Sequence, residues 1–246
     1  MISDIWNSAV YQPLYNVLIL LIDNLPGHSV GLAIILLTII VKIVLFPLTA
    51  KSIRAQREMK ELEPELKKLK ERHGDDKQKL AAETMALYQK RGVTPFSGCL
   101  PLLIQIPVII GLYWVFSHGL GKIDTAILYS FVSAPLMLDM HFLVFDLAGK
   151  SIFLALLAGV TQFIQTHVAL GKQVPPAAVV PGSKPSFQED FARSMQVQMR
   201  YVLPVIVGGI SMTLPAAVAL YWATSNILST GQELITKKRV IASSAK

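Results

Sequence analysis

The residue of the sequence best placed to do chemistry is Lys42, the one charged residue between His28 and Lys51. Roughly 20 apolar residues in a helix cross a bilayer core, and this stretch is long enough to do so. A cation in the central part of a span costs roughly 2.5 to 3.5 kcal/mol, and a water-filled cavity would remove much of that cost. With Thr49 at the end of the span, a rise of 1.5 Å per residue puts Lys42 about 10 Å deep. Lys42 therefore predicts a hydrophilic cavity, and a lysine that snorkels to the surface is the simpler alternative.

Other polar residues lie in apolar stretches and could line the same cavity. Thr38 precedes Lys42 by one helical turn, so its hydroxyl is expected on the same face as the charge. Taken one at a time, such residues are more simply explained by hydrogen bonds between packed helices. As a set we expect them to wet one groove, and its candidate residues are Lys42, Thr38, Gln105, Gln162, Gln165, Ser225 and Asn226.

Bond-breaking chemistry is not expected. The apolar stretches contain no Ser/His/Asp set, no paired carboxylates and no histidine-rich metal spacing. The single cysteine, Cys99, excludes an internal disulfide and a cysteine-based metal cluster, and it is most simply a small packing residue. We therefore expect no catalytic residue, no metal and no cofactor.

The composition is that of a membrane protein. Hydrophobic residues make up 52% of the 246 and charged residues 16%, with a mean hydropathy of +0.50. An ordinary soluble chain has about a quarter of its residues charged. The net charge of +7 could suggest nucleic acid, but no soluble domain is visible to carry a basic patch. Excess Lys and Arg more simply mark cytoplasmic loops, so no direct nucleic-acid specificity is expected.

Apolar lengths predict an all-α membrane protein with five spans. The stretch from Tyr201 to Gln232 is long for one span, and two spans hinged near Pro215 keep the basic tail on the side of the other basic loops. Lys and Arg then place the N-terminus outside and the C-terminus in the cytoplasm. The expected segments are an N-terminal part with an interfacial helix (1–28), span one (29–50), a cytoplasmic helical hairpin (51–93), span two (94–117), an external loop with an interfacial segment (118–150), span three (151–171), a cytoplasmic loop (172–195), span four (196–214), span five (215–236) and a basic tail (237–246).

The polar insert between spans one and two has its own pattern. Apolar residues recur at steps of three and four among charges, which is typical of a narrow helical seam. Pro64 either ends this first helix or begins a new one. The insert is either a solvated connector or a docking arm for a cytosolic partner, and its length of about 40 residues favours the arm. Its candidate docking residues are Met59, Leu62, Leu66, Leu69, Asp75 and Asp76, the last two in the expected turn.

Three stretches resemble a known family: TIIVKIVLFPLT at 38–49, GDDKQKLAAETMALYQKRGVTPFSGCLPLLIQIPVIIGLYW at 74–114 and LPAAVALYWATSNILSTGQELI at 214–235. In this order they resemble the YidC/Oxa/Alb membrane protein insertases, over roughly residues 10 to 238, and look like a minimal bacterial member of that family. The resemblance implies five core spans around a hydrophilic groove that is open to cytoplasm and lipid and closed outside. It also implies a location in the bacterial inner membrane.

The same resemblance implies roles for residues and partners. Lys42 stands where the family usually has an arginine in the groove, and lysine lacks the planar fork of donors. Tyr221 and Trp222 match the family's aromatic pair, which contacts the apolar segment of the substrate; from the residues alone an interfacial belt fits equally. The implied partners are nascent membrane proteins and the lipid bilayer, with the Sec translocon, the ribosome and the signal recognition particle receptor left open. A monomer is expected because the groove would lie within one chain.

Two rival functions follow from the same residues. A small transporter or channel would use Lys42 as an anion site, and it would predict paired repeats or broken helices, of which the sequence shows no repeat. A membrane assembly scaffold would use the polar insert as a docking surface.

Overall fold

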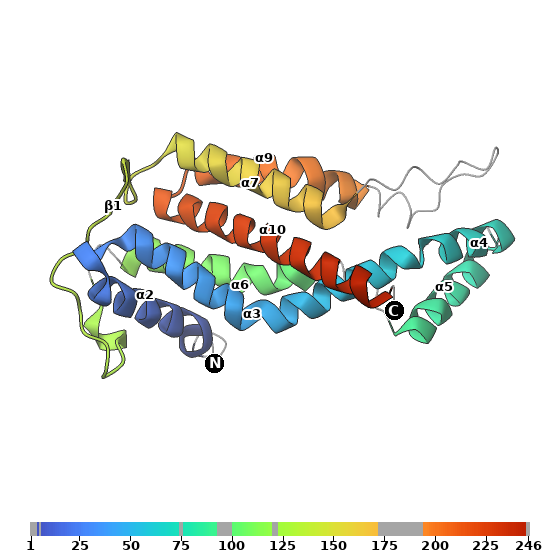
Figure 1. Cartoon of the computed structure of the whole chain (residues 1–246), viewed down its shortest axis with the longest axis horizontal. Helices are drawn as coiled ribbons and strands as arrows, with labels where there is room; N and C mark the ends of the chain where they lie inside the picture. The colour runs from blue at the N-terminus through green and yellow to red at the C-terminus, as the bar shows by residue number, and fades with distance from the viewer. Residues whose placement is uncertain are drawn as a thin grey trace.

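The computed structural model of the chain is helical along most of its described length (Figure 1). It describes residue 4 and residues 6–73, 76–92, 100–119, 123–171 and 194–244. The expected turn residue Asp75, together with Cys99, lies outside these ranges, as does most of the expected loop 172–195. The α-helices are α2 (Gln12–Asn24), α3 (Val30–Glu61), α4 (Glu63–His73), α5 (Lys77–Arg91), α6 (Leu100–Trp114), α7 (Ile152–Leu170), α9 (Leu203–Ser211) and α10 (Ala216–Ser244).

Short elements join or extend these helices. Single π-helical turns precede α2, follow α6 and precede α9, at Asn7–Tyr11, Val115–Gly119 and Gln198–Val202, and 3-10 turns occupy Pro26–His28 and Thr125–Ile127. Two strands of two residues each, β1 (His141–Phe142) and β2 (Phe145–Asp146), pair antiparallel. The all-α expectation did not include these strands, because two residues are too few to show a period of two in the sequence.

The longest helix, α3, carries Lys42 and begins after a tight turn. Gly27 there has a φ of +70°, a left-handed conformation that glycine adopts without steric cost. The helix contains Pro47 and continues past residue 50 to Glu61. A helix interior tolerates proline in an apolar bundle because neighbouring groups can satisfy the freed carbonyl.

The polar insert forms two shorter helices that lie side by side at one end of the molecule (Figure 1). Pro64 is the second residue of α4, a position where its missing N–H costs nothing, so it begins a new helix. The α5 helix begins at a cap in which Asp76 accepts from the Lys79 amide at 3.0 Å. Ion pairs join the two helices: Arg91 with Glu65, and His73 with Glu83 at 3.2 Å.

The remaining helices form a bundle in which α10 packs against both α7 and α3, and α7 packs against α9. The backbones of α7 and α9 approach closely at Gly159, where a Cβ atom would lie 3.3 Å from the carbonyl oxygen of Pro204 and 3.4 Å from the Cα of Gly208. At the far end of α7, the buried Arg200 donates to the Gly171 carbonyl at 2.6 Å. A cation at a helix C-terminus is favoured by the helix dipole.

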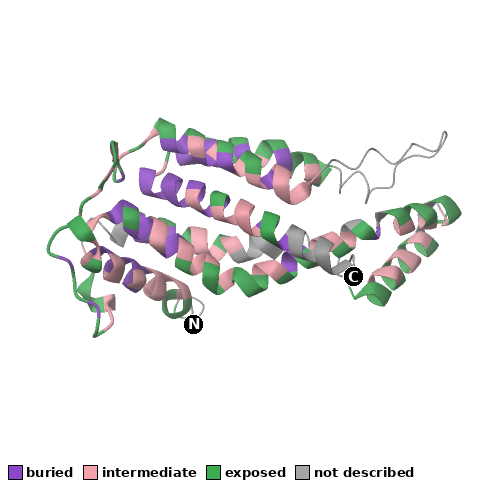
Figure 2. Cartoon of the chain, viewed as in Figure 1, coloured by how far each residue is buried: buried purple, intermediate pink, exposed green. Residues whose placement is uncertain are grey.

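Burial is uneven along the bundle. The fully buried large side chains gather in α2, the first half of α3 and the start of α10, at the end where the strands lie (Figure 2). Toward α4 and α5 the same helices become less buried. One end of the bundle is therefore a dry, packed core, and the region around Lys42 lies beyond it.

The outward faces of the bundle are apolar. Large apolar side chains are exposed along α3, α6, α7 and α9. Among the described residues, α3 and α7 are both long and apolar enough to cross a membrane, and the described part of α6 is apolar but shorter. A soluble surface rarely carries so much contiguous apolar area. The architecture fits a membrane protein, and the number of spans stays a prediction.

Candidate functional site

Lys42 joins three helices. Its Nζ donates to Ser229 Oγ of α10 at 2.8 Å and to Gln105 Oε1 of α6 at 3.3 Å. Both acceptors are neutral. Among the described residues, ion pairs lie in the polar insert and the outer loop, away from Lys42. The cation is thus half-buried, and its two hydrogen-bond acceptors are uncharged.

Tyr221 closes the inner side of this cluster. The Gln105 amide donates to the Tyr221 hydroxyl, so glutamine links the lysine to the tyrosine. Ser225, one turn along α10, also hydrogen-bonds to the tyrosine hydroxyl. We call Lys42, Gln105, Tyr221, Ser225 and Ser229 the polar cluster.

Sequence reasoning named four members of this cluster and missed Ser229. A signal was available, because Tyr221, Ser225 and Ser229 follow one another at steps of four residues and so share one face of a helix. A face that carries a hydroxyl on three successive turns indicates a polar environment in an otherwise apolar helix.

Thr38 lies on the helix that carries Lys42 but is fully buried. Its hydroxyl donates to the Ile34 carbonyl at 2.6 Å, within α3. A threonine bonded back to its own helix offers no donor to a ligand. In this structure Thr38 is a buried residue one helical turn before Lys42, and its hydroxyl is not part of the polar cluster.

The other expected groove residues form separate pairs. Gln162 donates to Gln165 at 3.2 Å within α7. Asn226 donates to the Ala158 carbonyl and to Thr161 Oγ1, both at 3.3 Å, and so ties α10 to α7. These hydrogen bonds, all among described residues, lie within α7 or between α10 and α7 and do not involve the polar cluster.

The aromatic pair on α10 is buried. Tyr221 is 1% exposed and Trp222 is 9% exposed. An interfacial belt requires aromatic rings on the outer surface at the headgroup level, so the belt alternative does not fit. Contact with an apolar segment of a client stays a prediction, and it would require Trp222 to become exposed.

A second polar contact lies toward α4 and α5. Gln232 of α10 donates to Thr49 of α3, near the proline of that helix. Lys42 with Ser229 and Gln232 with Thr49 therefore connect α3 and α10 along the half of their seam that lies beyond the packed core.

The expected docking residues of the polar insert lie on both sides of the break between α3 and α4. Met59 is on α3, Leu62 sits buried at the break, and Leu66 and Leu69 are on α4. The groove between α4 and α5 is lined by charged and apolar side chains together, with a volume of about 390 Å³. Its lining residues are Glu65, Lys68, Leu69, Arg72, Glu83, Ala86, Leu87 and Lys90.

The polar cluster offers groups that can bind an oxygen-bearing ligand. One cation and several neutral hydroxyl and amide groups can hold a carboxylate or a carbonyl oxygen. A search of the described residues for groups of three or more His, Cys, Asp or Glu that could hold a metal finds none.

Comparison with known proteins identifies the family. The sequence model of the 60Kd inner membrane protein family matches residues 21–243. The membrane protein insertase YidC of Oceanobacillus iheyensis is 31% identical over 246 residues, which cover 97% of this chain and 86% of that protein. The membrane protein insertase MisCA of Bacillus subtilis is 33% identical over 238 residues, or 94% of this chain and 79% of that protein.

A third relative is longer. YidC of Methylobacillus flagellatus is 34% identical over 243 residues, and this chain covers 38% of its length. The resemblance inferred from the three sequence stretches is confirmed by these matches. The chain belongs to the 60Kd inner membrane protein family, which here includes relatives named as YidC and MisCA insertases.

Proposed function

We propose that this protein is a membrane protein insertase that inserts and helps to fold nascent membrane proteins, alone or with the Sec translocon. The names of its relatives support this activity. The observation that carries it is the half-buried Lys42, held by neutral groups from two other helices inside an apolar bundle. Such an arrangement suits a site that must bind a passing polar segment and release it again.

We further propose five spans around a groove that contains the polar cluster. In this arrangement the crossing segments are α3, α6 with the π-turn that follows it, α7, the helical segment 194–211 that ends in α9, and α10, with α4 and α5 in the cytoplasm and the strands outside. The dry core then closes the outer end, and the polar cluster faces the cytoplasmic half. A polar segment is costly in bare hydrocarbon, and a wet half-membrane cavity shortens the dry path that it must cross.

Lys42 acts in this scheme as a transient partner for the client. A carboxylate of the polar flank replaces Ser229 and Gln105 on Nζ, because a hydrogen bond between two charged groups is stronger than one to a neutral acceptor, and a carbonyl exchanges with them on nearly equal terms. The apolar segment of the client leaves between α3 and α10. With a single charge the bias is on the order of a few kcal/mol, and no bond is made or broken.

Depletion of the host's insertase followed by rescue with this chain tests the proposal. The readout is insertion of a small client with a short translocated tail, scored by protease protection. We expect rescue to near wild-type insertion. A chain that is well expressed, membrane-bound and unable to rescue would overturn the proposed activity.

Variants at Lys42 test the site. Lys42→Leu is expected to lower insertion of a client with an acidic tail about tenfold, which corresponds to roughly 1.4 kcal/mol. Lys42→Arg, the matched control, keeps the charge and is expected to stay within about threefold of the wild type, a change below about 0.7 kcal/mol. A client with an uncharged tail should be affected less by Lys42→Leu. If the leucine variant inserts both clients as well as the wild type does, Lys42 is a lysine that snorkels to the surface and has no role in insertion.

A further inference from the structure

The two-strand hairpin formed by β1 and β2 ends in an unusual tip. Its two turn residues, Leu143 and Val144, are 82% and 86% exposed. Hairpin tips in contact with water are normally glycine, asparagine or aspartate. Two large apolar residues exposed together at a tip favour a partner that is itself apolar.

The backbone conformation of the turn adds a steric cost to leucine at position 143. Leu143 has a φ of +55°, in the left-handed region that few residues other than glycine adopt readily. Glycine is the usual residue where only the first of two turn positions has a positive φ. A leucine in this position is explained if its side chain makes a contact that glycine could not make.

The base of the hairpin is fixed to three helices. Phe142 packs against Gly31 of α3 so closely that a Cβ there would lie 2.3 Å from the ring. Phe145 stacks on Phe153 of α7, with ring centroids 5.3 Å apart. The amide of Ala216, the first residue of α10, donates to the carbonyl of Gly149 at 2.8 Å. The tip is therefore held in a defined orientation by a rigid base.

The tip continues an apolar surface of the bundle. Phe153, which stacks on the hairpin, is itself exposed on α7, next to the exposed Ile152 and followed one turn later by Leu156. In Figure 1 the strands run across the long axis of the bundle, beside the N-terminal end of α7. The outward face of α7, one of the helices apolar enough to cross a membrane, thus leads to the hairpin.

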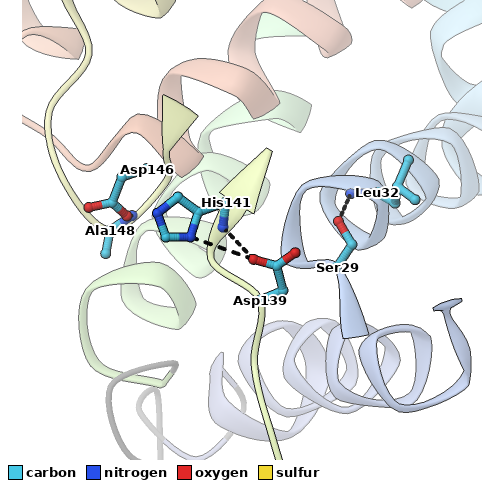
Figure 3. A network of polar contacts seen from close by, with 6 residues as sticks. All are labelled: Ser29, Leu32, Asp139, His141, Asp146 and Ala148. Carbon is cyan, nitrogen blue, oxygen red and sulfur yellow. Dashed lines mark hydrogen bonds and ion pairs between the residues drawn. The ribbon is translucent and has the colours of Figure 1, made fainter. Parts of the chain in front are cut away.

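Polar groups lie at the base of the hairpin (Figure 3). Asp139 accepts from the amide of His141 at 2.9 Å and lies 3.6 Å from its ring nitrogen. Asp146 accepts from the amide of Ala148 at 3.0 Å. A polar base behind an apolar tip is the distribution that a membrane interface favours, with charges at headgroup depth and apolar atoms below.

We propose that Leu143 and Val144 form a lipid-binding wedge, which inserts into the headgroup–acyl boundary of the leaflet on the strand side of the bundle. Lipid is the occupant because the patch is continuous with the apolar face of α7 and is bordered by polar groups. The wedge fixes the height of the bundle in the bilayer at that end. It depends on membrane placement alone and is independent of the insertase activity, so a test needs no client.

Thiol reactivity in liposomes tests the wedge without an apolar label. The full chain carries Cys99→Ala and either Val144→Cys or the control Lys150→Cys, an exposed position farther along the same loop. The probe is a water-soluble thiol reagent, applied to vesicles that contain only this chain and phospholipid. A thiol in apolar surroundings stays protonated and unreactive. We expect at least tenfold slower modification at position 144 than at position 150, and equal rates after solubilisation in denaturant.

A second variant removes the wedge and keeps the turn. Leu143→Gly in the Val144→Cys chain supplies the residue that the positive φ prefers, and it is expected to raise the reaction rate at least threefold. Equal rates at positions 144 and 150 in intact vesicles would overturn the proposal. The proposal would also be overturned if Leu143→Gly left the slow modification of the thiol at position 144 unchanged. The same holds if the protection of this thiol falls as the protein is diluted in lipid, or if it appears only in native membranes. Each of these outcomes indicates shielding by protein and not by lipid.

Discussion

The end of the bundle near the strands and the region around Lys42 are built in opposite ways. Near the strands, the buried Asn16 of α2 has fixed partners on both sides of its amide: it donates to the Gln12 and Ile127 carbonyls at 2.8 and 2.9 Å and accepts from the Tyr129 amide. Around Lys42, Tyr221 and Ser225 are buried, Gln105 and Ser229 are half-buried, and the cation rests on two neutral acceptors. The first arrangement holds a structure together, and the second leaves a cation available for exchange.

The contrast leads to an expectation about mutations. Changes in the packed end should reduce stability strongly, because buried donors and close backbone contacts have no substitute partners. Changes in the polar cluster should affect insertion while leaving stability nearly unchanged. Three substitutions test this difference, in order of decreasing effect on the free energy of unfolding.

The largest effect is expected from Asn16→Ala. It leaves the amide of Tyr129 without its partner in a part-buried setting and removes one of the two donors to the Ile127 carbonyl, which keeps Gln12, at a cost of about 2–3 kcal/mol. Equilibrium unfolding in mixed micelles measures the loss, and hydrogen exchange at the Tyr129 amide should locate it. Asn24→Ala is the matched control, since Asn24 is exposed on the same helix and its side-chain amide donates to the Leu20 carbonyl of that helix. A loss below about 0.5 kcal/mol for Asn16→Ala, the range of an ordinary surface substitution, would contradict the description of this end as fixed.

The parts of this contrast that the sequence predicts are those that depend on residues close together in the chain. The family, the helical class and the position of Lys42 on an apolar helix followed from local composition and from motifs. The sequence did not decide whether Pro64 ends one helix or begins another, because proline is found at both places. The role of Asn16 was missed, since its partners lie more than 100 residues away in the outer loop.

The polar cluster was predicted in part for a related reason. Lys42, Gln105 and Tyr221 were named because each is unusual within an apolar stretch or matches a family motif. Gln162, Gln165 and Asn226 are equally unusual in sequence, but the structure pairs them on or toward α7. Which side of a helix faces which neighbour is decided by packing between helices, and hydropathy does not report it.

A smaller loss is expected from Gly159→Val, at the crossing of α7 and α9. The Cβ would lie 3.3 Å from the carbonyl oxygen of Pro204, and the γ-methyl groups would press on Gly208. Overpacking of this kind costs about 1–3 kcal/mol. Gly209→Ala is the control, because a Cβ there meets nothing within 4 Å and alanine favours a helix. If the valine variant unfolds at the same denaturant concentration as wild type, the two helices do not depend on this close contact.

The smallest loss of stability is expected from Lys42→Met. Removal of the cation relieves part of its burial cost and sacrifices hydrogen bonds to two half-buried neutral groups, so the free energy of unfolding should change by less than about 1 kcal/mol or rise. Insertion of acidic clients by the same variant should nevertheless fall, as for leucine. A loss of about 2 kcal/mol or more would show that Lys42 ties α3, α6 and α10 together as a structural residue. The region around Lys42 would then resemble the packed end, and the lysine would have no freedom to exchange Ser229 and Gln105 for a client.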